Sequence, residues 1–262
     1  MLYNHLDESK FRNKLNVMLD RLDKKLSNCN DEEKIVRVVY DLIAQSVEPD
    51  YDALDGYLAL DLNDEATVED FVVKHVASFN AYGAIVNGRA TCMGVAQAYK
   101  LILDNYRVEA TSVMGLYDNT SHMLNVVELE GDKYYVDVSR ALVQENLPMV
   151  RYDCFLVGKD RIATYFVPNK DLGCVDNSRR TYFAKNYLEF KNGMDLRKYL
   201  TSFTYEKTNG DIRFFYKGNT FDNDDLEKIT EDIISVRCGR EYRIVGYSVN
   251  DGIGNCKITK RD

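Results

Sequence analysis

The chain has 262 residues, 45% of them hydrophobic and 29% charged, which is enough apolar material for a globular core. Its formal net charge of −8 argues against a nucleic-acid or anionic-membrane surface, where Lys and Arg dominate. The six cysteines include no C-x-x-C pair, so they do not indicate a zinc ribbon or a thioredoxin-type site, and we expect reduced thiols.

The N-terminal stretch MLYNHLDESKFRNKL lacks the apolar core of a signal peptide. Elsewhere, no apolar run approaches the roughly 20 residues that span a bilayer. As written, the sequence therefore predicts a cytoplasmic protein without a membrane partner, unless the chain has been trimmed.

Apolar residues at helical spacing predict three helices in the first third of the chain. The first carries Phe11, Leu15, Met18, Leu22 and Leu26 on one face. The second begins at Asn30, with Glu33 completing a capping-box pattern. Segment 48–57 breaks the periodicity and is predicted to be a loop. The third helix opens at Thr67 and Asp70, and its apolar face holds Val68, Phe71, Val72 and Phe79.

A turn at Asn87-Gly88 precedes a fourth helix that begins near Cys92. The pattern then changes period and predicts strands over residues 108–115, 122–130 and 133–139. We expect the last two to form a hairpin that turns at Gly131-Asp132. Residues 140–170 show no clear period and are predicted to wrap the core in short irregular pieces.

The last third predicts a helix around residues 196–203, a strand at 211–218, a helix at 226–236 and a hairpin across Asp251-Gly252. The first of these helices would end near Asn209-Gly210, and a hairpin at this Asn-Gly is the alternative to it. The order of elements indicates an α+β fold in three parts. We expect an N-terminal helical segment (1–29), a core (30–175) and a small C-terminal α+β extension (176–262).

Cys92 is the first candidate for chemistry because it lies at a helix start. A free cysteine has a pKa near ~8.5, and the unpaired N–H groups of a helix N-terminus favour the reactive thiolate. The thiol still needs a base and a group that orients this base.

Among the three histidines, His122 fits the role of the base best. His5 lies near the chain end and is expected on the surface, whereas His75 shares a helical face with phenylalanines and is expected to be a partly buried structural residue. His122 instead opens a predicted strand.

Asp137 lies in the following apolar strand, where an unpaired carboxylate would be costly to bury. With a turn at Gly131-Asp132, Val126 faces Asp137, so that His122 and Asp137 point to the same side. The offset of four residues is roughly 13 Å at ~3.3 Å per residue, and a bulge would have to shorten it. The residues also fit a purely structural reading, with Cys92 in the core, His122 at a strand end and Asp137 near a turn.

The segments AYGAIVNGRATCMGVAQAYKLIL and SHMLNVVELEGDKYYVDVS resemble the core of the transglutaminase-like superfamily, in its bacterial cysteine-protease-like branch. The match runs from about residue 81 to 139, and a weaker echo covers EKIVRVVYDLIAQSVEPDYD. The resemblance implies a papain-like core with N-terminal helices packed on an antiparallel sheet. It further implies acyl transfer, with Cys92 as nucleophile, His122 as general base and acid, and Asp137 as the residue that orients His122.

In such a site the backbone N–H of Cys92 would stabilise the oxyanion, and Tyr82 and Asn87 are polar candidates for the second donor. The sequence departs from the family at Leu124, where an aromatic residue is usual, and at Thr91, where a small apolar residue is usual. Both departures could reshape the groove for the acyl group.

We expect hydrolysis of a peptide or amide bond in a peptide or protein substrate, without cofactor or metal. Nothing in the sequence suggests the calcium sites or accessory β-domains of animal tissue transglutaminases. Three alternatives stay open: glycanase-like deamidation or arylamine-type acyl transfer by the same residues, and an inert binding or structural module on the same fold. A zinc site of Cys, His and Asp lacks a fourth ligand.

Overall fold

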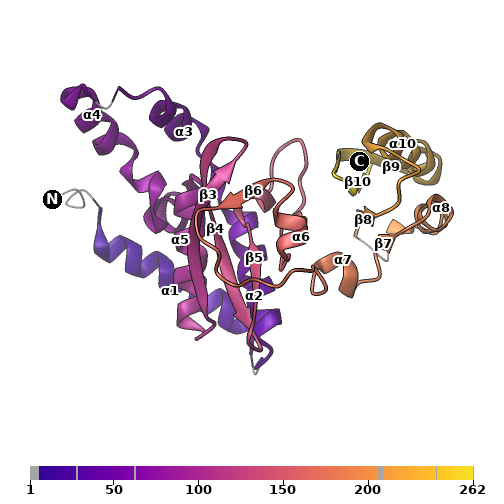
Figure 1. The fold of residues 1–262 in the computed structure, drawn as a ribbon, viewed down its shortest axis with the longest axis horizontal. Helices are drawn as coiled ribbons and strands as arrows, with labels where there is room; N and C mark the ends of the chain where they lie inside the picture. The colour runs from indigo at the N-terminus through magenta and orange to yellow at the C-terminus, as the bar shows by residue number, and fades with distance from the viewer. Residues whose placement is uncertain (1–5, 28, 62, 206–208, 240, 262) are drawn as a thin grey trace. The chain divides into compact units, whose positions relative to one another are not determined.

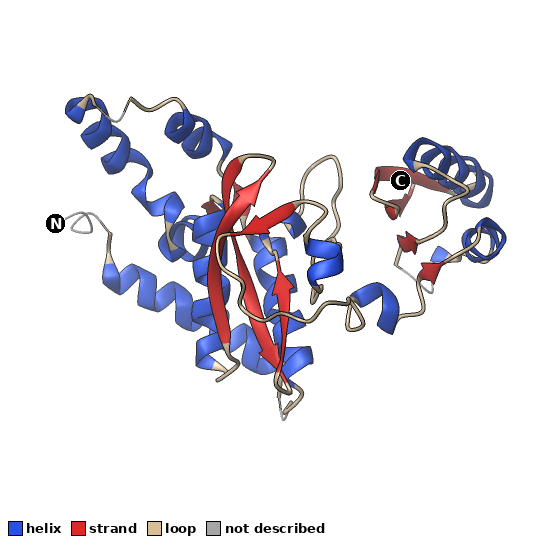
Figure 2. Cartoon of the chain, viewed as in Figure 1, coloured by secondary structure: helices blue, strands red, loops and turns tan. Residues whose placement is uncertain are grey.

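The computed structural model describes residues 6–27, 29–61, 63–205, 209–239 and 241–261. They form two compact units, and each is built from segments that are distant in sequence. Unit 1 comprises Met1–Leu142 and Cys154–Ser178, and unit 2 comprises Val143–Asp153 and Arg179–Asp262. In unit 1 most of the helices precede an antiparallel sheet, and unit 2 combines helices with a mostly antiparallel sheet (Figure 2), which confirms the predicted α+β class.

Unit 1 begins with helices and continues with a sheet (Figure 1). Its helices are α1 (Glu8–Lys25), α2 (Glu32–Ser46), α3 (Tyr51–Leu58), α4 (Glu65–His75), η1 (Val76–Phe79), η2 (Gly83–Asn87), α5 (Cys92–Asn105), η3 (Ser139–Ala141) and α6 (Lys159–Ile162). Its strands are β1 (Glu48–Pro49), β2 (Arg89–Ala90), β3 (Ala110–Tyr117), β4 (Thr120–Leu129), β5 (Asp132–Val136) and β6 (Phe166–Pro168).

Aspartates set the starts of the first helices. Asp31, rather than the predicted Asn30, caps α2 by accepting from the backbone N–H of Lys34. Asp64 caps α4 in the same way, so this helix begins before the predicted Thr67. The predicted loop at 48–57 is wrong, because Asp50 caps the short helix α3. A helix of this length has too few turns for an apolar stripe to be recognisable in the sequence.

The sheet of unit 1 has the order β5-β4-β3-β6, and its β4–β5 hairpin turns one residue earlier than predicted. Glu130 and Gly131 both have positive φ, at 55° and 86°, which matches the two-residue turn that right-twisted hairpins favour. Leu129 therefore pairs with Asp132, and Asn125 pairs with Val136. The register is shifted by two residues from the prediction, so the side chains keep their faces but change their partners.

The two faces of this sheet are covered by different segments. Helix α5 packs on β3 and β4, with α2 behind it, and the buried Tyr99 hydroxyl donates to the Val36 carbonyl at 3.0 Å. The segment 154–178 covers the opposite face and adds β6 to the sheet edge, so residues 154–170 of the predicted wrapping segment 140–170 do pack on this core. Residues 143–153 of that segment instead belong to unit 2. The core on this face contains Val113, Leu124, Val126, Tyr135, Val157, Ile162, Phe166 and Cys174.

Unit 2 is a second α+β unit with its own core. Its elements are α7 (Tyr182–Lys185), α8 (Gly193–Thr201), α10 (Asn223–Cys238), β7 (Glu189–Phe190), β8 (Asp211–Tyr216), β9 (Tyr242–Asn250) and β10 (Ile253–Lys260). The strand order is β7-β8-β10-β9, and the predicted hairpin across Asp251-Gly252 is confirmed. Helices α8 and α10 supply Leu196, Leu200, Leu226, Ile229 and Ile234 to the core.

The six cysteines are all free, and four of them are buried: Cys154, Cys174, Cys238 and Cys256. Cys29 and Cys92 are half-buried. Across the described ranges, the helices are too short or too polar to traverse a bilayer.

Candidate functional site

Cys92 is the first residue of α5, as the sequence predicts. Its side chain is half-buried. The preceding Thr91 is buried and does not cap the helix. Its backbone N–H and its hydroxyl instead both donate to the Ser78 carbonyl, at 2.9 and 3.1 Å. Thr91 therefore fixes the helix start to η1, while its side chain leaves the N–H groups of the first turn of α5 to other acceptors.

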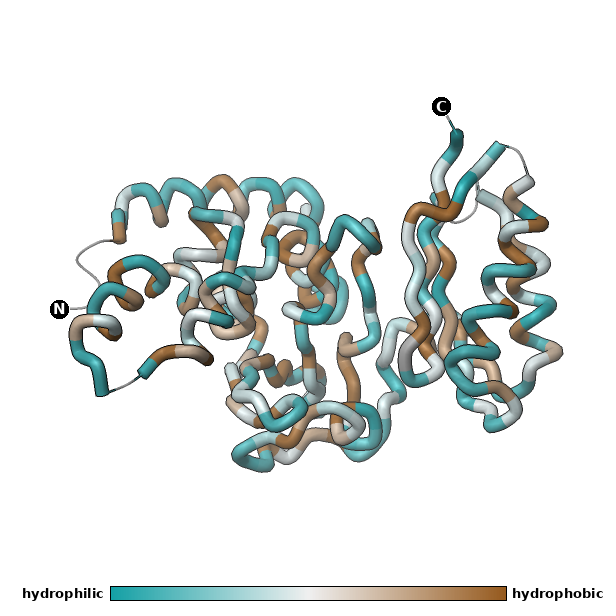
Figure 3. Tube along the Cα trace, turned by 90° about the horizontal axis from the view of Figure 1, so that it is seen from above, coloured by the Kyte–Doolittle hydropathy of each residue, from teal (hydrophilic) through white to brown (hydrophobic). Residues whose placement is uncertain are grey.

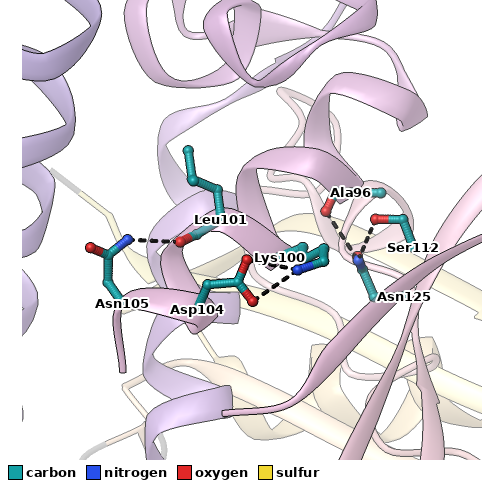
Figure 4. A network of polar contacts seen from close by, with 7 residues as sticks. All are labelled: Ala96, Lys100, Leu101, Asp104, Asn105, Ser112 and Asn125. Atoms are coloured by element: carbon teal, nitrogen blue, oxygen red, sulfur yellow. Dashed lines mark hydrogen bonds and ion pairs between the residues drawn. The ribbon is translucent and has the colours of Figure 1, made fainter. Parts of the chain in front are cut away.

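Two contacts fix α5 against its surroundings. A Cβ on Gly94 would lie 2.6 Å from the Ser78 carbonyl oxygen, so the helix start approaches the η1 backbone as closely as glycine permits. On the sheet side, the fully buried Asn125 donates from Nδ2 to the Ala96 carbonyl at 3.0 Å and to the Ser112 hydroxyl at 3.2 Å (Figure 4). Asn125 lies on β4, the strand that carries His122, so the bond joins the two elements of the site.

His122 and Asp137 are in direct contact. His122 Nε2 lies 2.8 Å from Asp137 Oδ2, the imidazole is 14% exposed and the carboxylate 1%. The observed register explains the contact without a bulge, because Asp137 follows Val136 and lies two residues, not four, from the position opposite His122. Diagonal cross-strand neighbours are within reach of long side chains. The predicted 13 Å gap is wrong for this reason.

The Cys92 thiol lies near enough to the same imidazole to help raise its pKa. Since Nε2 faces Asp137, Nδ1 is the ring atom left for the sulfur. The structure thus brings Cys92, His122 and Asp137 together in series.

Electrostatics favour an ionised pair between His122 and Asp137. Burial alone would lower the pKa of His122, but the charge and hydrogen bond of Asp137, followed by those of Cys92, raise it from 6.5 to about 10. Burial alone would raise the pKa of Asp137, but His122 and the Ser139 hydrogen bond hold it below its ordinary value. The imidazole is therefore a protonated, hydrogen-bonded cation at neutral pH.

Asp137 is held by two further donors that the sequence analysis did not identify. Its second oxygen, Oδ1, accepts from the Ser139 hydroxyl at 2.6 Å and from the Arg140 backbone N–H at 3.3 Å. The backbone N–H of Asp137 donates to the Cys154 carbonyl at 2.9 Å. An aspartate followed by polar residues two and three positions later is a local capping pattern, and this signal in VDVSR could have identified Ser139.

Aromatic rings enclose the imidazole. The Tyr117 and Phe166 rings lie 5.7 and 6.0 Å from the His122 ring, centroid to centroid. The Arg140 guanidinium lies over the Tyr165 and Tyr117 rings, at 4.4 and 5.2 Å, and its charge also favours the Asp137 carboxylate. No pattern in the sequence indicates this arrangement, since the residues come from β3, β4, η3 and the segment around β6.

The remaining predicted site residues have other surroundings. Tyr82 stacks on Phe11 of α1, with 6.0 Å between ring centroids, and Asn87 is exposed at the end of η2. Leu124 is 1% exposed and packs in the core, so it does not line an open surface.

The other two histidines do not join this cluster. His75 is partly buried and stacks on Phe71, with 4.9 Å between ring centroids. His5 lies outside the described residues. In the part of the chain that the structure describes, no group of three or more Cys, His, Asp or Glu residues is arranged to hold a metal ion.

Comparisons with known proteins add little to this description of the site. No protein-family model matches the chain, and no curated protein matches its sequence. A solved structure titled "Crystal structure of a TGase" is similar over 51% of this chain and 33% of its own, with 12% identity and a TM-score of 0.41. This chain thus corresponds to about a third of that structure's length, and a likeness at this level does not carry the functional argument.

Proposed function

We propose that the chain is a thiol-dependent acyl-transfer enzyme that hydrolyses a peptide or amide bond through Cys92, His122 and Asp137. The observation that carries the proposal is the imidazole of His122, which lies 2.8 Å from a buried carboxylate and whose pKa is also raised by the thiol at the start of α5. The sequence resemblance to the transglutaminase-like superfamily supports the same assignment.

The reaction starts from a Cys92 thiolate beside the His122 imidazolium. In its first half, the sulfur attacks the carbonyl carbon and forms a C–S bond. The electron pair of the C=O bond moves onto oxygen, and we expect the backbone N–H of Cys92 to donate to this oxyanion. As the oxyanion collapses, the C–N bond breaks and His122 gives its proton to the leaving nitrogen. An amine leaves, and a thioester on Cys92 remains.

In the second half, His122 is neutral and accepts a proton from water as the water oxygen attacks the thioester carbon. The C–S bond then breaks, which releases the carboxylic acid and restores the thiolate beside the imidazolium. Asp137 keeps the imidazole oriented throughout and stabilises its charged form. Ser139 and the Arg140 backbone hold Asp137 in turn.

Leu124 stands where the family usually has an aromatic residue, and its core position shows what this difference changes. The side chain packs among Val113, Val126 and Tyr135 rather than beside the sulfur. The missing aromatic residue is therefore a change in core packing, and none of the three reacting groups is altered by it.

The test is labelling with an iodoacetamide-alkyne probe, in which Cys92 and Cys29 are the two half-buried thiols. We expect the wild type and the matched control Cys29→Ala to be labelled rapidly and Cys92→Ala to lose the rapid phase. His122→Ala should slow the labelling of Cys92, because the thiolate loses its counter-ion. Equal labelling of the wild type and Cys92→Ala would reject the assignment.

Turnover is tested with casein as a protein substrate and dansyl-cadaverine as a competing amine. Cleavage that depends on Cys92 supports hydrolysis, whereas incorporation of the amine would indicate transamidation by the same thioester. A reactive Cys92 without turnover of any amide would favour the alternative, an inert module that binds polypeptide on this fold.

A further inference from the structure

The segment that carries α3 and α4, residues 50–75, exposes several large apolar side chains to solvent. We call this segment the arm. Leu58 and Val73 are 59% and 54% exposed, and Tyr57 is also exposed. None of the residues of α4 is buried, although Val68, Phe71 and Val72 recur at helical spacing. Figure 3 shows hydrophobic residues alternating with hydrophilic ones along the arm.

The rings of the arm pack on one another. Phe71 lies 6.3 Å from Tyr57 and 5.9 Å from Phe79 between ring centroids, and α4 packs chiefly on α3 and η1. This small aromatic cluster is enough to hold the two helices together, but it leaves Leu58 and Val73 in water. An exposed apolar face on an ordered pair of helices is typical of a surface that binds another polypeptide.

The arm is also strongly acidic. Residues 50–75 contain eight Asp and Glu residues and a single basic residue, Lys74, so nearly all of the chain's net charge of −8 lies in this segment. Glu69 and Asp70 are exposed on α4 near Val73, so charge and apolar surface are interleaved on one helix. Phosphate groups and a second acidic copy of the arm would be repelled here, whereas Lys and Arg side chains would be attracted.

The base of the arm is fixed next to the candidate site. Helix α4 continues directly into η1, and within η1 the Ser78 carbonyl accepts both donors of Thr91, the residue before Cys92. The Phe79 carbonyl accepts from the Gln97 amide on α5 at 3.4 Å. A ligand on the arm would therefore be held by a segment that is anchored at the start of the Cys92 helix.

We infer that the arm docks a polypeptide segment in which Lys or Arg side chains alternate with aliphatic or aromatic ones. Basic groups on the ligand face Glu69, Asp70 and their acidic neighbours, and apolar side chains cover Leu58 and Val73. That this segment belongs to the substrate of Cys92 rests on the proposed function. The docking itself does not.

The experiment measures binding of a fluorescein-labelled amphipathic peptide of Lys and Leu to the full chain with Cys92→Ala, so that no turnover intervenes. We expect the double variant Leu58→Ser/Val73→Ser to bind the peptide roughly tenfold more weakly or worse, because two apolar side chains no longer bury their surface against it. The matched apolar control is Val236→Ser on α10, where Val236 is 81% exposed. This control should bind as the parent does.

Charge is tested by Glu69→Lys/Asp70→Lys on α4 against Glu231→Lys/Asp232→Lys on α10, an adjacent exposed Glu-Asp pair of the same net charge. The arm variant should weaken binding, and the α10 variant should change it less than about twofold. If both double substitutions weakened peptide binding equally, the peptide would be attracted by the net charge of the chain alone, and the inference would be overturned. Equal binding of a Glu and Leu peptide would overturn it too.

Size-exclusion chromatography with light scattering tests self-association. If the wild type is a dimer that Leu58→Ser/Val73→Ser dissolves, the face is an interface between copies and the inference is wrong. Binding on the arm together with an unreactive Cys92 would leave the docking intact and remove only its link to catalysis.

Discussion

The substitution Asp137→Asn tests the central ion pair while keeping the shape of the side chain. It removes the charge that faces His122 Nε2 at 2.8 Å and leaves an oxygen that can still accept a hydrogen bond. The pKa of His122 should fall from about 10 toward or below its ordinary 6.5, because the ring stays buried. Cys92→Ala should lower it less, since Asp137 is the stronger cause of the elevation.

The energetic effect follows from the same values. A pKa of about 10 against 6.5 corresponds to roughly 5 kcal/mol, at about 1.4 kcal/mol for each pKa unit. Breaking a buried ion pair by removing one partner costs about 3–5 kcal/mol. We therefore expect Asp137→Asn to lower the free energy of unfolding by about 3–5 kcal/mol below pH 6.5, where the contribution of the imidazolium is complete.

The sign of the pH dependence is fixed by the raised pKa. Between pH 6.5 and about 10 the unfolded chain has lost the His122 proton while the folded chain keeps it, so the stability of the wild type falls as pH rises. Asp137→Asn should lack this slope, and the two stabilities should converge near pH 10.

The assays are urea denaturation across this pH range and ¹⁵N NMR titration of the imidazoles. The chain has just three histidines, and the spectrum of His122→Gln assigns the signal. Asp104→Asn is the matched control, because Asp104 forms an exposed pair with Lys100 at 2.7 Å that is worth about 0.3–0.5 kcal/mol (Figure 4). A wild-type His122 that titrates near 6.5, or one that titrates identically in Asp137→Asn, would refute the pairing.

Three further substitutions test how the site is supported, each by urea denaturation. Ser139→Ala loses the 2.6 Å hydrogen bond to Asp137, and it should cost about 1.5–3 kcal/mol and raise the pKa of Asp137. Ser139→Thr should restore both, and an unchanged NMR titration of the Asp137 carboxyl group would remove Ser139 from this role. Asn125→Ala should cost about 1–3 kcal/mol, because two buried bonds are lost, and a loss below about 0.5 kcal/mol would contradict the anchoring of the Cys92 helix. Gly94→Ala places a Cβ 2.6 Å from a carbonyl oxygen and should cost about 1–3 kcal/mol or more; a neutral effect would show that the helix start can shift.

The parts of the fold that sequence predicts well are those with strong local signals. The long helices α1, α2, α5 and α10 carry clear apolar stripes, and the β4–β5 and β9–β10 hairpins carry Gly in their turns. Short α3 was missed, since one cap and two turns leave no visible period. The position of Cys92 at a helix start also follows from local sequence, because a Gly turn and a row of small residues precede and follow it.

The spatial arrangement of the site depended on contacts between distant segments. A one-residue difference in the turn, at Glu130-Gly131, changed the register by two and brought Asp137 within reach of His122. Periodicity fixes which face a strand residue occupies, but the turn fixes its partner, so sequence alone gave the side and missed the distance. The grouping of 143–153 with 179–262 likewise arises from packing between segments that no sequence pattern connects.

The sequence by itself determined the α+β class, most of the elements and the order in which a cysteine, a histidine and an aspartate follow one another, because these depend on spacing and capping along the chain. Only the tertiary structure decided that Asp137 contacts His122, that Leu124 belongs to the core and that the arm leaves its apolar face in water. Burial and the hydrogen bonds between distant segments are properties of the packed chain, and no local pattern specifies them.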